Sequence, residues 1–273
     1  MNFLKILSRL SLALLLFSLA TILFNVFENG LEGLSLEFIT SNPKRSGREG
    51  GVLSVIISTS IIVGIAILTA LPLGLGGAFF LSMFCKQTNK LAMLIRSALD
   101  ILSATPSIVF GLFGSAFFCL YLEFGFSLLA GGLTLACMIL PLIVRLTESA
   151  ITALPREQIE NAYSLGFSKT STFLKVILPL ISAPLSAAIT LAIARALSET
   201  AALLFTSGYV TRTPESLFDS GRTLSVHIFD LSMNVPGGDK NAYSSALVLL
   251  GLLIIINIST SIIKNLLSEK YAN

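Results

Sequence analysis

Charged side chains are scarce in this sequence. Asp, Glu, Lys and Arg together make up 12% of the 273 residues, whereas hydrophobic residues make up 54%. A soluble globular domain has about 25% charged residues. The chain therefore has too few charges to cover the surface of a water-soluble globule, and we expect lipid to cover much of it. The net charge of +3 is also too small to indicate a nucleic-acid partner.

Residues that usually carry catalysis or bind metals are scarce as well. The single histidine is His227, to which no role is assigned, and the three cysteines are Cys85, Cys119 and Cys137. The cysteines are odd in number and lack the spacing of a Cys/His metal site, so we interpret them as small buried apolar residues. No G-x-x-x-x-G-K-(S/T) phosphate loop and no Ser/His/Asp cluster occurs. We therefore expect no catalytic residue, metal or cofactor in this chain.

Long apolar runs, in contrast, are abundant. Each is long enough to cross the ~30 Å hydrocarbon core of a bilayer as a helix, and the run at 52–84 is longer than one span requires. They predict an all-α integral membrane protein with six transmembrane helices, at residues 10–27, 52–84, 101–122, 127–144, 182–205 and 242–263. Pro72 and the glycines that follow it predict a kink in the second span. The first run could also be a cleaved signal peptide, but its length and the lack of a clean cleavage site favour a retained helix.

The placement of basic residues predicts the orientation. If both termini are cytoplasmic, the inner segments hold eleven of the eighteen Lys and Arg residues, as the positive-inside rule requires. The predicted outer loops are then 28–51 and 206–241. We divide the chain into a first helix with its outer loop (1–50), a core of five helices (51–264) and a cytoplasmic tail (265–273). A short basic loop is expected around Lys86, Lys90 and Arg96.

The polar connector between the fourth and fifth spans, which opens at Arg145, predicts a structured cytoplasmic loop over 146–180. Pro155 fits the first turn of a short helix over 156–164, and Gly166 fits a left-handed residue that ends it. Ser168 fits the N-cap of a second helix over 169–178.

The second helix is expected to end at Pro179. An ordinary solvated loop is the alternative, but Ile159, Tyr163 and Phe167 give this helix–glycine–helix elbow apolar positions. They favour docking on another protein.

The fifth predicted span contains two charges, Arg195 and Glu199, four residues apart on one helix face. A charge at the bilayer centre costs about 2.5–3.5 kcal/mol on insertion scales, so the two are tolerable only if paired or hydrated. One reading is a structural ion pair. The other makes Arg195 a waypoint for an anionic solute, because a guanidinium matches the paired oxygens of a phosphate. Thr105-Pro106-Ser107 likewise either breaks the third span beside a cavity or makes a simple packing kink.

Several stretches together resemble a known family. The connector resembles the EAA loop of ABC-importer permeases through Glu160-Asn161-Ala162, Gly166 and Ile177-Leu178-Pro179. From about residue 50 to 264 the chain is similar to the phosphate-specific permeases of the Pst system, PstA-like in particular. The stretches that carry this likeness are Gly50-Gly51, TPSIVFGLFG at 105–114, LPLIVRLTE at 140–148 and RALSETA at 195–201. The chain departs from the family at three positions. Asn161 stands where the family usually has alanine, Ser198 where it usually has glycine, and Ala202 where it usually has proline.

The resemblance implies a type I ABC importer permease with a MetI-like fold, in a bacterial inner membrane. It implies a second, PstC-like permease subunit, a pair of PstB-like ATPase subunits that bind ATP and Mg²⁺, and a PstS-like phosphate-binding protein. The residues expected to couple to the ATPase are Arg156, Glu157, Glu160, Ala162 and Gly166. Those expected to line the translocation pathway are Arg195, Glu199, Thr200 and Ser107.

Three other functions are compatible with parts of the sequence. A permease for another oxyanion, such as molybdate or sulfate, would share the elbow and the six spans. A membrane-embedded regulatory subunit would transport nothing. A secondary transporter would need internal repeats and an ion-coupling site, and no repeat is visible.

Overall fold

The computed structural model describes the backbone of residues 2–85 and 88–272, and the side chains of residues 4–85 and 88–262. The described part is mostly helical, with irregular loops and an antiparallel pair of two-residue strands, β1 (Pro43–Lys44) and β2 (Glu49–Gly50). Four helices are long and apolar enough to cross a membrane, and six spans result if each of two bent helix pairs counts as one. The predicted all-α membrane fold is confirmed.

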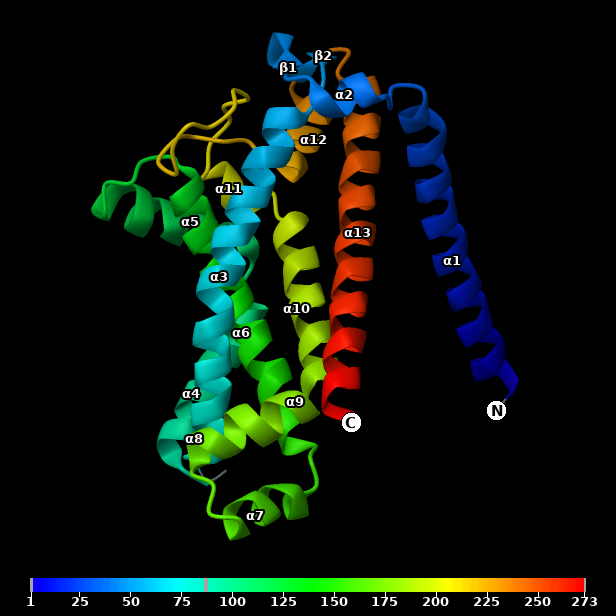
Figure 1. The fold of residues 1–273 in the computed structure, drawn as a ribbon. Helices are drawn as coiled ribbons and strands as arrows, with labels where there is room; N and C mark the ends of the chain where they lie inside the picture. Colours follow the sequence, from blue (N-terminus) through cyan, green and yellow to red (C-terminus); the bar gives the residue numbers. More distant parts are fainter. Residues whose placement is uncertain (1, 86–87, 273) are drawn as a thin grey trace.

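The centre of the bundle is the contact between α3 (Leu53–Met83) and α6 (Leu128–Thr152), which run side by side (Figure 1). Glycines allow this close approach. A Cβ at Gly74 would lie 2.6 Å from Ile143 Cγ2, and a Cβ at Gly132 would lie 2.6 Å from the Ile65 side chain. Pro72 lies inside α3 without interrupting it. Gly74, which lies in the region where we predicted a kink, therefore allows close packing of α3 against α6.

Helix α10 (Ser182–Leu197) and helix α13 (Asp239–Ala272) complete the bundle around this pair. The buried side chains of α3, α6 and α10 form one apolar core, including Ile62, Leu135, Ile139 and Ala192. The predicted fifth span is too long, because α10 ends at Leu197. A separate short helix, α11 (Ala201–Leu204), follows.

The predicted third span is wrong in its start and its shape. Two residues of the expected basic loop, Lys90 and Arg96, instead lie in helix α4 (Lys90–Ala104), whereas Lys86 lies outside the described residues. Asn89 caps α4 by accepting a hydrogen bond from Leu91 N at 3.0 Å. After Thr105 and Pro106 the chain turns by 101° into α5 (Ser107–Gly114) and η2 (Ser115–Tyr121). Proline disfavours a helical conformation at the preceding residue, so the chain breaks here as the sequence allowed.

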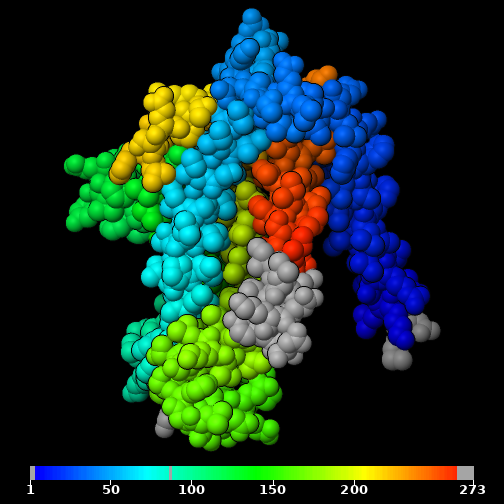
Figure 2. Space-filling view, viewed as in Figure 1, coloured from blue at the N-terminus to red at the C-terminus, as the bar shows by residue number. Residues whose placement is uncertain are grey.

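Helix α1 (Asn2–Leu31) lies beside the bundle and not within it (Figure 1). It contacts α13 near its C-terminal end, where Ser244 Oγ donates a hydrogen bond to Gly30 O at 3.0 Å. Its apolar side chains are otherwise exposed, and the space-filling view shows its N-terminal half standing clear of the other helices (Figure 2). It contains the predicted first span and is longer at both ends.

The two segments predicted as outer loops are partly helical and fold onto each other. Helix α2 (Leu36–Thr40) and the β1–β2 hairpin come from the first, and α12 (Leu224–Met233) comes from the second. Asn241 Nδ2 joins them by donating hydrogen bonds to Gly47 O at 2.9 Å and Arg48 O at 3.1 Å. We call this unit, residues 35–50 with 222–241, the outer cap.

A buried polar cluster lies inside the outer cap. Arg222 pairs with Asp230 at 2.9 Å, and Arg222 Nη1 lies 3.4 Å from His227 Nδ1. His227 is fully buried beneath Gly47, whose positive φ of +93° and contact with the imidazole leave no room for a side chain. Burial, followed by the Arg222 charge, lowers the pKa of His227 to about 4. His227, given no role above, is therefore a neutral core residue of the cap.

The outer cap is expected to loosen in mild acid. Because the pKa of His227 is depressed from 6.5 to about 4, its contribution to stability is complete above pH 6.5 and is lost as the pH falls towards 4. The loss amounts to about 3 kcal/mol at most. The protection factors of the backbone amides in α12 and residues 43–50, corrected for the intrinsic exchange rate at each pH, should fall between pH 7 and 4, and His227→Gln should remove most of this dependence. An unchanged pH dependence in that variant would contradict the assignment.

Candidate functional site

The predicted elbow is present at the end of the molecule opposite the outer cap (Figure 1). Its first helix, α7 (Arg156–Ser164), begins directly after Pro155. It ends at Gly166, whose φ is +80°, with Gly166 N donating to Tyr163 O at 2.9 Å and Phe167 N donating to Ala162 O at 3.1 Å. These two bonds form a Schellman motif, which satisfies the last carbonyls of a helix. The predicted helix and its glycine stop are confirmed.

The second half of the elbow is longer than predicted. Ser168 Oγ accepts a hydrogen bond from Ser171 N at 3.2 Å and so caps α8 (Lys169–Thr172), as expected. The chain then continues through η3 (Phe173–Ile177) and α9 (Leu178–Leu180) before it turns by 78° into α10. Pro179 does not end the helix, because it lies in the first turn of α9, where a missing N–H is tolerated.

The elbow presents an exposed, mixed surface. Leu165 is 77% exposed, and Tyr163 and Phe167 are each more than a third exposed. Arg156, Glu157 and Glu160 are exposed beside them, whereas Ala162 is buried against the elbow itself. Apolar side chains that are interspersed with charges of both signs suit a protein partner.

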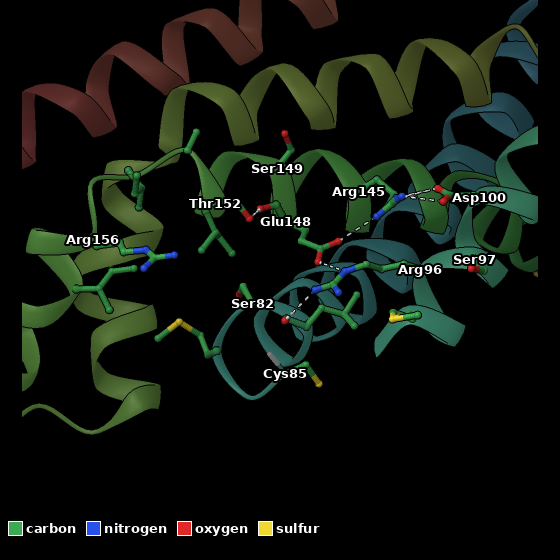
Figure 3. A pocket seen from close by; sticks show the side chains of 17 residues that line it. Ser82, Cys85, Arg96, Ser97, Asp100, Arg145, Glu148, Ser149, Thr152 and Arg156 are labelled. Atoms are coloured by element: carbon green, nitrogen blue, oxygen red, sulfur yellow. Dashed lines mark hydrogen bonds and ion pairs between the residues drawn. The ribbon is translucent and has the colours of Figure 1, made fainter. Parts of the chain in front are cut away.

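A chain of four charged residues lies where α4 meets α6, at the end of the bundle nearest the elbow (Figure 3). Glu148 accepts from Arg96 Nε at 2.7 Å and pairs with Arg145 Nη1 at 3.4 Å. Arg145 Nη2 binds both carboxylate oxygens of Asp100, at 2.6 and 2.8 Å. We call these four residues the charge network. Arg145 and Glu148 lie within α6, which continues to Thr152, so the predicted start of the connector at Arg145 is wrong.

The charge network lines a cavity of about 1090 Å³ between the ends of α3, α4 and α6 and the start of α7. Arg156 reaches this cavity from the elbow, across from Glu148 (Figure 3). Arg96 and Asp100 were not among the residues expected at a site, because α4 was predicted as a loop. The signal that could have found them is Asn89, an N-cap residue directly before a helix-forming segment.

Arg195 and Glu199 do not share a helix face, and the ion pair that was one of the two readings of them is absent from the described residues. The four-residue spacing brings side chains together only on an unbroken helix, and α10 ends between the two at Leu197. Glu199 Oε1 instead accepts a hydrogen bond from Ala202 N at 3.1 Å and so caps α11. Arg195 is half-buried on α10, and its guanidinium has no hydrogen bond or ion pair with the described residues.

The other predicted pathway residues lie on two short elements that pack together. Ser107 begins α5, and Thr200 precedes α11. The two helices meet where a Cβ at Gly111 would lie 2.9 Å from Ala202 Cα. Ser198, which departs from the family pattern, is exposed in the break, where its Oγ donates to Arg195 O at 3.1 Å. The helix bends earlier than expected, before Ala202 and not after it.

The spans, the two bent helix pairs and the elbow define the class of the protein: a permease of the MetI-like ABC importer fold. Two solved structures share the fold. A chain of an inward-facing MetNI methionine ABC transporter matches with a TM-score of 0.64 at 16% identity, over 79% of this chain and 95% of that one. A chain of a bacterial alginate ABC transporter matches with a TM-score of 0.70 at 9% identity, over 96% and 95%.

The particular family follows from the sequence comparison. The model of the binding-protein-dependent transport system inner membrane component family matches residues 70–273, and the chain belongs to this family. It is 30% identical to the probable ABC transporter permease protein YqgI of Bacillus subtilis, over 92% of both chains. It is 30% identical to the phosphate transport system permease protein PstC of Mesorhizobium japonicum, over 91% of this chain and 84% of that one. It is 31% identical to PstA of Haemophilus influenzae, over 74% and 71%.

Replacing Gly166 by valine tests the elbow. The added Cβ would meet no atom within 4 Å, so the cost is the left-handed backbone strain alone, about 1–2 kcal/mol. We expect the variant to insert into the membrane but to lose ATP-driven uptake or assembly. Gly125→Val is the matched control, because Gly125 also has positive φ and open space but lies in the turn after η2. Normal uptake by Gly166→Val would contradict the role of the elbow.

Proposed function

We propose that this protein is the permease subunit of an ATP-driven importer of inorganic phosphate and forms half of its translocation pathway. The observation that carries the proposal is Arg195, a cation on a membrane helix whose guanidinium has no partner among the described residues. An unpaired guanidinium inside a bundle suits an anionic solute. The similarity to PstA and PstC proteins supports phosphate as that solute.

The same proposal covers the partners. The exposed elbow would receive an ATPase subunit, of which a PstB-like pair would bind ATP and Mg²⁺ outside this chain. A PstC-like permease would supply the other half of the pathway, and a PstS-like phosphate-binding protein would dock on the outer cap. This places the elbow and both termini in the cytoplasm of a bacterium and the outer cap outside the inner membrane, in line with the distribution of Lys and Arg.

The mechanism is a switch that the partner drives. ATP binding would close the ATPase pair and draw the elbows together, with Arg156, Glu157 and Glu160 in the contact and with Ala162 and Gly166 holding the shape of α7. The 78° turn at Ile181 joins the elbow directly to α10, so that movement of the elbow reorients the helix that carries Arg195. Arg195, Glu199, Thr200 and Ser107 would then contribute to a pathway that is open to one side at a time.

Uptake of labelled phosphate by the complex that co-purifies with this chain tests the function. We expect excess unlabelled phosphate to suppress uptake, excess sulfate or molybdate to have little effect, and loss of the ATPase to abolish it. Suppression by sulfate or molybdate would instead indicate a permease for another oxyanion. Uptake that does not depend on an ATPase would indicate a secondary transporter, and a complex without any uptake would indicate a regulatory subunit.

Replacing Arg195 by glutamine tests its place in the pathway. Loss of one charge-assisted contact with the solute, worth about 1.5–3 kcal/mol, should reduce transport at least about tenfold while the complex still assembles. Arg212→Gln is the matched control, since Arg212 is an exposed outer arginine that pairs with Asp219 at 3.6 Å. Failure of Arg195→Gln to assemble would show that Arg195 is a structural residue.

A further inference from the structure

The last turn of α3, residues 79–84, is held by the elbow through a cation. Lys169, the first residue of α8, donates from Nζ to Met83 O at 3.0 Å. The same ammonium lies 4.5 Å from the centre of the Phe84 ring. The last carbonyls of a helix lack partners within the helix and carry partial negative charge, so a cation satisfies and stabilises them. Lys169 therefore binds the end of α3 at two groups, the backbone carbonyl of Met83 and the aromatic ring of Phe84.

An aromatic contact one helical turn further along the elbow adds to this attachment between the elbow and α3. The rings of Phe173 and Phe79 lie 4.5 Å apart, and Phe79 meets Phe84 edge-on at 5.3 Å. Phe173 is buried, and Ala78 and Ile177 belong to the same apolar cluster. Lys169 and Phe173 are four residues apart and so contact α3 from one face of the elbow. Two contacts fix both the position and the direction of the second elbow helix.

A residue of the core, Arg96 on α4, also binds this last turn of α3. Arg96 Nη2 donates to Leu81 O at 3.4 Å, and Arg96 Nε binds Glu148 of α6 at 2.7 Å. Glu148 belongs to the charge network, which continues to Asp100 on α4 (Figure 3). The end of α3 thus lies between a cation from the elbow and a cation from the core. Displacement of the elbow must either carry this turn with it or break the Lys169 and Phe173 contacts.

We propose that the last turn of α3 transmits the movement of the elbow to the core, with Lys169 and Phe173 as positioning residues on the elbow and Arg96 as the positioning residue on the core. The elbow then acts on the bundle through two routes. One is the covalent route through Ile181 into α10, and the other is the non-covalent route through α3 to α4 and α6. The proposal rests on the proposed role of the elbow in coupling, but not on phosphate as the solute.

The test is the number of solute molecules transported per ATP hydrolysed, measured in the purified complex after reconstitution. Lys169→Met keeps the aliphatic stem and removes the charge. We expect this variant to lower the ratio about threefold. A threefold change corresponds to about 0.7 kcal/mol, which is the contribution of one exposed charge contact. Lys169→Arg should restore the ratio. Lys175→Met is the matched control, since Lys175 lies on the same elbow but faces Phe167 at 6.0 Å. An unchanged ratio in Lys169→Met overturns the proposal.

A second measurement does not depend on the solute or on full activity. Hydrogen exchange of residues 79–85 in the complex should change when ATP and vanadate are added, and this change should be lost in Lys169→Met and in Phe173→Ala but kept in Lys175→Met. A response that persists in both elbow variants overturns the proposal, even if one of them transports poorly. If the complex transports another oxyanion, the ratio is measured with that solute, so failure of the phosphate assignment and failure of this transmission route remain distinguishable.

Discussion

The close contact between α3 and α6 is the constraint on which the other features depend. In a bilayer the hydrophobic effect does not drive helices together, and packing of small residues with satisfied polar groups takes its place. Gly74 and Gly132 allow the two helices to approach until Ile143 and Ile65 fill the space that a side chain would need. This contact sets where α3 ends relative to α6. The charge network and the attachment of the elbow are both built around that end.

The two ends of the molecule contain buried or half-buried charges, and these charges are compensated in different ways at each end. In the outer cap, Arg222 and Asp230 form a closed pair beside a neutral His227. At the elbow end, a chain of four charges is open to a large cavity. A buried, fully paired group resists movement, because separating it leaves uncompensated charges. The partly exposed network can exchange partners at lower cost, which fits a position beside an elbow that we propose to move.

Several features that local sequence determines were predicted correctly. Pro155, Gly166 and Ser168 act within three or four residues of themselves, so the helix–glycine–helix elbow could be located before any tertiary contact was known. Hydropathy likewise placed most of the membrane spans. Some errors fall where a distant residue decides: Arg96, expected in a loop, pairs with Glu148, 52 residues away on the neighbouring helix α6. Others, at Asn89 and Pro179, are local signals that were missed or misread. Arg195 and Glu199 are separated because the chain breaks between them to let α11 pack against α5.

By itself, the sequence determined the class of the protein: a multi-pass helical membrane bundle with a structured elbow between two of its spans. These properties follow from composition and from short-range backbone chemistry, which need no knowledge of the fold. Only the tertiary structure decided which charges pair, where the spans break, and that Lys169 lies at the end of α3. Such contacts join segments that are tens of residues apart, and no local pattern specifies them, because many alternative pairings satisfy the same local rules.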